Sequence, residues 1–180
     1  MFAELGANAS VDEIARRSGM AKGTFFRHFS TKEDLIQALV ADRLVRLGEV
    51  AHEINTTREP GWSTLGLMTE RLLEQIEDDR LLAEFVERRR HSTPSEEIIQ
   101  AVQTLAAEVD RALSGAQERG EVRADVIERD VAEILFMIAR ATAPHRATQP
   151  TLGRRYLRLF LDGIRAGHTS DLGDPPGHQN

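Results

Sequence analysis

Two helix-start signals lie close together near the N-terminus of the chain, with a glycine between them. Ser10-Val-Asp-Glu13 places a serine three residues before a glutamate, and Ser30-Thr-Lys-Glu33 repeats that spacing. In such a capping box the serine hydroxyl accepts a hydrogen bond from a free backbone amide, and the glutamate reaches back to the serine amide. Gly19 can adopt the left-handed conformation that ends many helices. This spacing predicts two short helices before the second box, over about 11–18 and 22–28.

Helical periodicity continues along the rest of the chain, whereas strand signals are scarce. Aromatic residues make up only 5% of the sequence and no Asn-Gly turn is present, which together indicate an all-α fold. Residues 55–63 contain Pro60 and Gly61 and are predicted to form a loop. The remaining helices are expected over 31–54, 64–77, 79–91, 95–119, 128–143 and 151–167, with Gly120 ending the fourth of them and a disordered tail over 168–180.

The composition is that of a globular chain and excludes several classes of protein. Apolar residues make up 41% of the 180 residues and charged residues 29%, which allows a sizeable core. No apolar run approaches the roughly 18 residues that a membrane-spanning helix needs, and no signal peptide is visible. Cysteine is absent, so disulfides and thiol chemistry are excluded. We therefore expect a cytoplasmic protein.

Positive charge is concentrated toward the N-terminal part of an otherwise acidic chain. The net charge of the whole chain at pH 7 is −6, but residues 1–47 carry +1 and the remainder carries −7. The two lysines of the chain, Lys22 and Lys32, both lie in this first part. The overall acidity therefore does not exclude nucleic-acid binding by a local surface near the N-terminus.

Two short helices joined by a glycine turn and followed by a longer helix form the helix-turn-helix arrangement. In DNA-binding proteins of this kind the second helix enters the major groove through its N-terminal end, which is Ala21-Lys-Gly-Thr24 here. Lys22 can reach a phosphate or a guanine, and Thr24 can contact a base or a thymine methyl. Lys32 lies at the start of the next helix, where free backbone amides also favour a phosphate.

The amino-acid sequence of this stretch resembles the DNA-binding domain of the TetR/AcrR family of bacterial transcriptional regulators. The resemblance rests on Val11-Asp-Glu-Ile-Ala-Arg-Arg-Ser-Gly19, Lys22-Gly-Thr-Phe-Phe-Arg-His-Phe29 and Thr31-Lys-Glu-Asp-Leu35. It implies a three-helix DNA-binding domain over 1–47, joined by a long helix to a larger helical domain over 48–167 that binds an effector and dimerises. The implied function is a homodimeric repressor that a small-molecule effector releases from its operator.

By this resemblance, nine positions are expected to contact DNA. They are Ser10, Val11, Lys22, Gly23, Thr24, Phe26, Arg27, His28 and Lys32. Phe26 stands where the family usually carries a tyrosine, so the phosphate contact of that hydroxyl is missing. Met1 and Phe2 fall in the middle of the family's first helix, so we expect this helix to be truncated and DNA binding to suffer. The alternative function is a helical ligand-binding or protein-interaction module that has lost DNA binding through this truncation.

The last two expected helices carry strong apolar faces, Val131–Ile138 and Tyr156–Ile164. A chain of this size cannot bury all of these large side chains on one side of its own core. A four-helix bundle with two helices from each copy would absorb the excess, so we expect a homodimer formed through these helices. The alternative is an ordinary intramolecular core.

Effector contacts are expected among large apolar side chains of the helical domain, because pockets between helices are lined mainly by such groups. Arg140 follows an apolar run and can face an anionic effector, or else pair with a carboxylate or cover apolar surface. The six histidines show no metal-binding spacing and no catalytic motif is present, so we expect no metal, no cofactor and no enzyme. The candidates besides Arg140 are Leu67, Met68, Leu72, Phe85, Phe136 and Met137, each of which can equally be a core residue.

Overall fold

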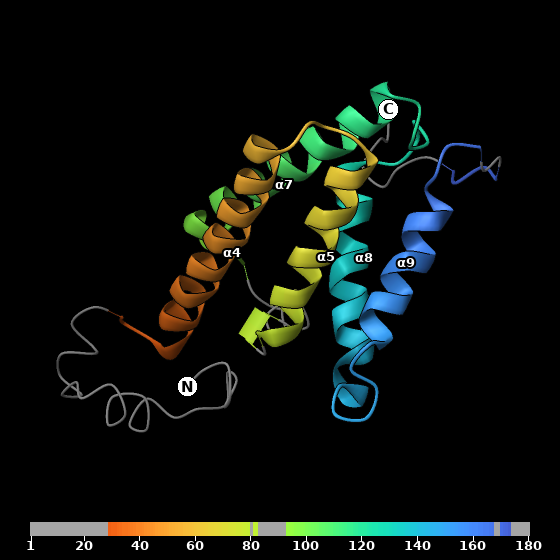
Figure 1. Cartoon of the computed structure of the whole chain (residues 1–180). Helices are drawn as coiled ribbons and strands as arrows, with labels where there is room; N and C mark the ends of the chain where they lie inside the picture. The colour runs from red at the N-terminus through yellow and green to blue at the C-terminus, as the bar shows by residue number, and fades with distance from the viewer. Residues whose placement is uncertain (1–28, 80, 83–92, 168–169, 174–180) are drawn as a thin grey trace.

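The computed structural model describes residues 29–79, 81–82, 93–167 and 170–173. This part of the chain is all-helical, as the periodicity predicts, and its one extended pairing is an isolated antiparallel bridge between Val122 and Arg165 (Figure 1). The elements in chain order are α4 (Lys32–Thr57), α5 (Trp62–Asp78), α7 (Glu96–Glu118), α8 (Glu128–Thr142), the 3-10 turn η2 (Ala143–His145) and α9 (Leu152–Gly163).

Helix α4 begins at a capping box that lies one residue later than the sequence predicts. Thr31, not Ser30, is the N-cap: its hydroxyl accepts a hydrogen bond from the Asp34 amide at 3.1 Å. The Asp34 carboxylate in turn accepts from the Thr31 amide at 2.8 Å. The prediction that Ser30 and Glu33 form this box was therefore wrong, because an aspartate three residues after a threonine closes the same reciprocal pair.

The long helix also ends later than predicted. α4 runs through Thr57, so that the expected loop over 55–63 shrinks to residues 58–61. The hydroxyls of Thr56 and Thr57 donate to backbone carbonyls one turn earlier, so both hydroxyls have hydrogen-bond partners within the helix. Gly61 turns the chain with a φ of +152°, a conformation that favours glycine.

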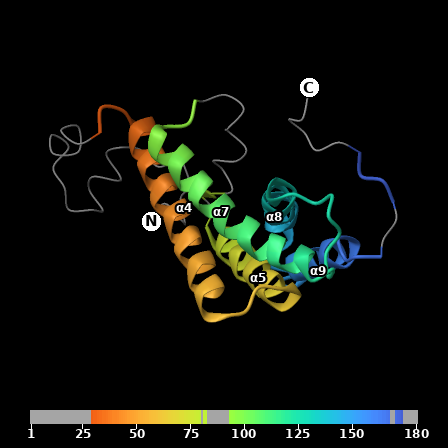
Figure 2. The same ribbon diagram turned by 90° about the horizontal axis from the view of Figure 1, so that it is seen from above.

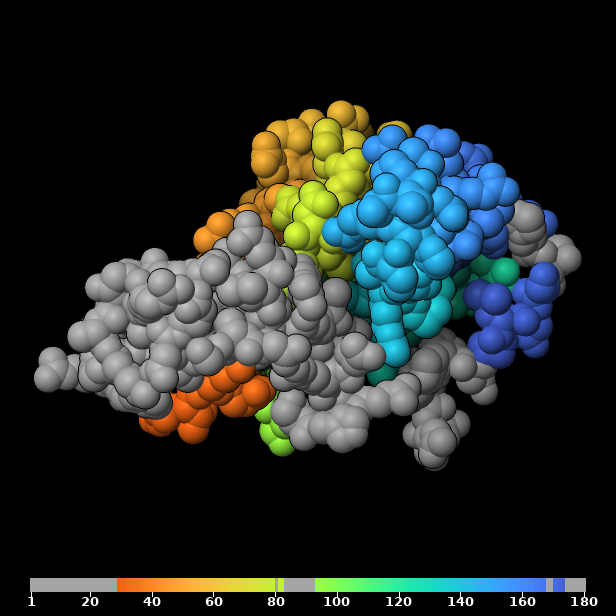
Figure 3. Space-filling model, turned by 90° about the horizontal axis from the view of Figure 1, so that it is seen from below, coloured from red at the N-terminus to blue at the C-terminus, as the bar shows by residue number. Residues whose placement is uncertain are grey.

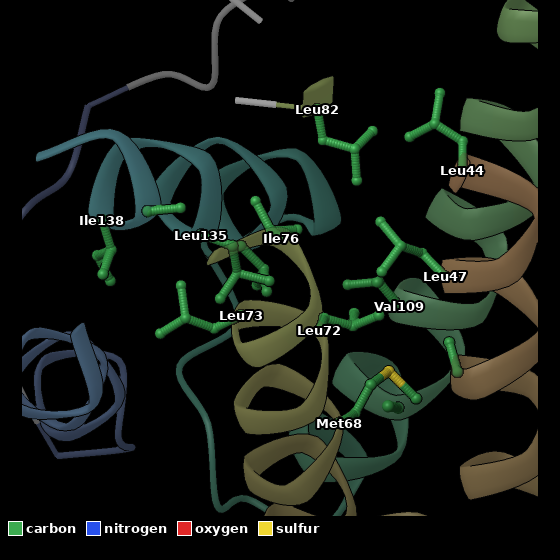
Figure 4. Close-up of a cluster of buried hydrophobic side chains, with 14 of the residues drawn as sticks. Leu44, Leu47, Met68, Leu72, Leu73, Ile76, Leu82, Val109, Leu135 and Ile138 are labelled. Atoms are coloured by element: carbon green, nitrogen blue, oxygen red, sulfur yellow. The ribbon is translucent and has the colours of Figure 1, made fainter. Parts of the chain in front are cut away.

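Helix α5 is the central helix and contacts each of the four other long helices (Figure 2). Its buried residues recur every three or four positions, which places them along one face of the helix. Two buried threonines, Thr64 and Thr69, fit this core because their hydroxyls donate to the carbonyls of Glu59 and Leu65. Figure 4 shows leucines of α4 and α5 meeting in this core.

The C-terminal helix is shorter than predicted. α9 ends at Gly163 rather than near residue 167, because the chain leaves the helix to pair with the segment after α7. The Ala166 amide donates to the Glu121 carbonyl, and the Arg165 guanidinium lies 4.2 Å from the centre of the Trp62 ring. The end of α7 agrees with its prediction, since Gly120 follows it with a φ of +67°.

Several predictions fall on residues outside the described ranges. They are the helices over 11–18 and 22–28, most of the helix over 79–91 and most of the tail over 168–180. Leu81 and Leu82 are helical, which agrees with the third of these.

Candidate effector cavity and DNA-binding segment

A cavity of about 350 Å³ lies between α4, α5, α7 and α8. Its wall is mostly apolar and includes side chains from all four helices. Leu44 and Leu47 of α4 face Leu72 and Ile76 of α5 across it, with Leu82 beside them (Figure 4). The other lining residues are Val102, Leu105, Ala106, Val109, Glu128, Arg129, Ala132, Glu133, Leu135 and Phe136.

The charged groups of the cavity wall all come from the first half of α8. They are Glu128, Arg129 and Glu133, of which Arg129 and Glu133 are exposed to solvent. The rest of the wall carries no formal charge. The cavity can therefore hold an apolar body, with polar contacts available near the start of α8.

The structure brings two of the seven predicted effector residues to this cavity, Leu72 and Phe136. Met68 is fully buried one turn before Leu72, and Leu67 is half-buried on the same helix; neither belongs to the lining. Met137 is 58% exposed and points away from the core, while Arg140 is exposed in the last turn of α8 and is also outside the lining. Phe85 lies outside the described residues.

Several residues of the cavity wall are ones that the sequence marks only as part of an apolar face. The apolar spacing of α7 predicts that Val102, Leu105 and Val109 face inward, and the stripe of α4 does the same for Leu47. Periodicity identifies the face of each helix that points toward the core. It does not show where a cavity remains between the packed helices. The charged residues of α8 carried no signal at all, because solvent-exposed charges are ordinary at a helix start.

One of the nine predicted DNA contacts, Lys32, lies in the described part of the chain. It is the first residue of α4, half-buried, and follows directly on the Thr31 cap. Phe29, next to the predicted contacts, packs partly buried against the hydrophobic core. The other eight predicted contacts lie outside the described residues, namely Ser10, Val11, Lys22, Gly23, Thr24, Phe26, Arg27 and His28.

Glu108 of α7 holds the second half of α4 in place. Its carboxylate lies 2.8 Å from His52 Nδ1 and accepts a hydrogen bond from Asn55 Nδ2, also at 2.8 Å. The Glu108 side chain is only 14% exposed. Burial raises its pKa, but the hydrogen bonds from Asn55 and His52 and the charges of His52 and Arg111 outweigh burial, so the pKa lies below its ordinary value of 4.5.

We expect the Glu108→Gln substitution to lower the free energy of unfolding by about 1 kcal/mol at pH 7, because it removes a charge-assisted contact. A carboxylate with a lowered pKa stabilises the fold above its unfolded pKa and loses that effect as the pH falls through the folded value. The difference between wild type and variant should therefore shrink once the pH drops below 4.5. Urea unfolding at pH 7, 5 and 3.5 checks this, and a difference that stays constant with pH would contradict it.

Large apolar side chains are exposed on the last two helices. Met137 of α8 is 58% exposed, and Tyr156 and Leu159 of α9 are 40% and 60% exposed. The two helices pack side by side, and seen from below α9 lies on the side away from the start of α4 (Figure 3). In a single copy of the chain, none of the described residues covers these exposed side chains of α8 and α9.

Neither a membrane span nor a metal site emerges from the described residues. None of their helices is long and apolar enough to cross a bilayer. They also contain no group of three or more histidine, cysteine, aspartate or glutamate side chains placed to hold a metal ion.

Comparison with known families assigns two parts of the chain. Residues 1–39 match the N-terminal domain of bacterial regulatory proteins of the tetR family. Residues 63–166 match the C-terminal domain of SbtR-like transcriptional regulators. The Transposon Tn10 TetC protein of Escherichia coli is 32% identical over 80 residues, which is 44% of this chain and 40% of that relative.

Solved structures agree with this assignment. A TetR transcriptional regulator from Streptomyces coelicolor is 26% identical over 93% of each chain, with a TM-score of 0.65. The regulator FadR from Bacillus subtilis, solved in complex with stearoyl-CoA, shares the fold at 20% identity and a TM-score of 0.70, over 91% of this chain and 93% of its own. The resemblance in the N-terminal motifs is thus confirmed, and the chain belongs to the TetR family of transcriptional regulators, with an SbtR-like C-terminal domain.

Proposed function

We propose that the protein is a sequence-specific DNA-binding repressor that a small-molecule effector releases from its operator. The observation that supports this proposal is that the cavity is lined in part by α4, the helix whose first residue is the predicted DNA contact Lys32. One helix thus has its start at the DNA-binding segment and its middle at the cavity wall. Residues 1–47 would bind DNA, and residues 48–167 would bind the effector and dimerise.

The cavity supports an effector that is largely apolar. Its wall joins apolar side chains of four helices, and its volume is that of a small organic ligand. An effector lowers operator affinity only if it binds the two conformations of the protein differently, typically by 1–3 kcal/mol. We infer that the two conformations differ in the position of α4, because this helix lines the cavity and also begins at the DNA-binding segment.

We propose that the active form is a homodimer, joined through α8 and α9. The exposed Met137, Tyr156 and Leu159 support this interface, because a second copy of the same face would remove them from water. Two copies would then present two DNA-binding segments to half-sites about one helical turn, or a multiple of it, apart.

The experiment that tests the function is fluorescence anisotropy with DNA from upstream of the protein's own gene and a scrambled duplex. Each duplex is titrated at low and at physiological salt. Tight binding to the native fragment alone, falling steeply with salt, supports the proposal, because neutralised phosphates release counterions. Failure on both fragments, also with the chain extended upstream, favours the alternative of a helical module without DNA binding.

We expect Lys32→Ala to weaken binding to native and scrambled DNA alike. Loss of one phosphate contact should lower the slope of log affinity against log salt by about one ion. Thr24→Ala should instead weaken the native fragment more than the scrambled one, because base contacts carry the specificity. Arg58→Ala is the matched control: it removes one positive charge at the opposite end of α4. If all three variants change both DNAs equally, Lys32 and Thr24 do not have these separate roles.

A further inference from the structure

The cavity between the four helices has an apolar end and a charged end. The side chains of α4, α5 and α7 that line it are all apolar, and Figure 4 shows Leu47 and Leu72 on this side. Every formal charge of the lining belongs to Glu128, Arg129 or Glu133, near the start of α8. A ligand that fills the cavity therefore places its apolar part against α4, α5 and α7 and its polar group beside α8.

The three charged residues of the lining differ in their surroundings. Arg129 and Glu133 are exposed and lie one turn apart on α8, so each can compensate the charge of the other in water. Glu128, the first residue of the helix, is half-buried. Within the part of the chain that the structure describes, no side chain pairs with its carboxylate by a hydrogen bond or an ion pair. The Glu128 carboxylate is thus the charge that a bound ligand would cover while it has no protein partner.

Covering the Glu128 carboxylate selects for the charge of the ligand. Removal of water from an unpaired carboxylate is unfavourable unless the group gains a cation or a hydrogen-bond donor. An apolar ligand without a donor supplies neither, and an anionic group adds repulsion. A protonated amine supplies both a positive charge and N–H donors, which form the stronger, charge-assisted kind of hydrogen bond. The lining as a whole has the same preference, since it contains two carboxylates and one guanidinium.

Two features near the start of α8 could favour an anion instead, namely Arg129 and the free backbone amides of the helix start. Arg129 is exposed and lies one turn from Glu133, so its charge is compensated in water. The Ile127 amide donates to the Asp130 carboxylate at 3.0 Å. Glu128 and Asp130 also complement the positive end of the helix dipole. An anionic group at this end of the cavity would therefore lie beside the acidic side chains of the first turn.

We propose that the effector is a cationic amphiphile, an amine whose ammonium group binds Glu128 and whose apolar part fills the cavity. The inference rests on the proposed function, because it names the ligand class of the same cavity. The volume of about 350 Å³ sets the size of this ligand. A water molecule takes up about 30 Å³ in the liquid, and a methylene group is of similar size, so the cavity holds roughly a dozen heavy atoms.

The test compares three probes that share one chain length and differ in charge: decylamine, decanol and decanoate. Each is titrated into the full chain at pH 7 by isothermal titration calorimetry, below the concentration at which it forms micelles. We expect the protonated amine to bind about tenfold more tightly than decanol, because it makes a charge-assisted hydrogen bond with Glu128. Decanoate should bind more weakly than decanol, because its carboxylate lies beside the acidic start of α8.

Two substitutions locate the preference and the site. Glu128→Gln keeps the size of the side chain and removes its charge, so it should lower the affinity for decylamine about tenfold and leave that for decanol unchanged. Glu118→Gln is the matched control, because it removes the same charge at an exposed position of α7 outside the lining. Ala132 is half-buried and lines the cavity, so Ala132→Phe fills the space and should abolish binding of all three probes. Circular dichroism shows that each variant keeps its helices.

The possible failures are distinguishable. Equal affinity for decylamine and decanol, tighter binding of decanoate, or a preference for the amine that survives Glu128→Gln overturns this inference alone, since the cavity still takes an apolar ligand. Binding of none of the probes, or undiminished binding to Ala132→Phe, overturns the inference and also the effector part of the proposed function. Absence of operator binding overturns only the proposed function, because these titrations contain no DNA.

Discussion

Gly115→Ala is expected to lower the free energy of unfolding by about 2 kcal/mol, although alanine is the better helix former. A Cβ atom at Gly115 would overlap Cβ of Pro60 and lie 3.3 Å from its Cα. The proline ring cannot rotate away, so α7 or the loop before α5 must shift. Overpacking of this kind costs about 1–3 kcal/mol, and more when backbone must move, against a gain of about 1 kcal/mol in helix propensity.

Gly66→Ala is the matched control for this prediction. Gly66 is also a helix residue, but a Cβ atom there would have no neighbour within 4 Å. Its replacement should raise stability by up to about 1 kcal/mol. Both variants are compared with wild type by urea unfolding at one fixed protein concentration, because dimerisation would make the transition concentration-dependent. If Gly115→Ala stabilises the protein as Gly66→Ala does, the contact with Pro60 is not tight.

The helices could be predicted from the sequence because their signals are local. Ser95 and Gly120 mark the bounds of α7, and the apolar spacing within it gives the buried face. Where the prediction made α9 too long, a distant contact decided the outcome. α9 ends early because residues 164–166 pair with the segment after α7, more than 40 positions earlier in the chain. The local sequence pattern does not indicate such a distant partner.

The candidate site was predictable in part, for the same reason. The motifs near the N-terminus indicate the family directly, and the DNA contacts inferred from that resemblance stay a prediction. Leu72 and Phe136 were found as large inward-facing side chains, but Met68 has the same local pattern and is part of the solid core. The difference between them depends on how four helices pack together. The contact between His52 and Glu108 joins residues 56 positions apart, so no local sequence pattern indicates it.

Leu159→Asp is expected to weaken dimerisation by at least about 100-fold. Leu159 is 60% exposed in a single chain, so its replacement removes little from the chain's own core. In the proposed dimer it would be covered by the partner copy. An unpaired carboxylate buried there would cost about 3–5 kcal/mol, where each 1.4 kcal/mol is a factor of ten in affinity. Two-fold symmetry places the substitution in the interface twice.

Sedimentation velocity over a range of micromolar concentrations measures this effect, with Val45→Asp as the matched control. Val45 is 49% exposed but lies on α4, away from the proposed interface, so its variant should sediment like the wild type. Because two half-sites are bound together only by a dimer, Leu159→Asp should also reduce operator affinity while leaving the helical circular-dichroism signal intact. A wild-type monomer, or a Leu159→Asp variant that remains a dimer, would show that α8 and α9 do not form the interface. The exposed apolar face of α8 and α9 would then need a different occupant.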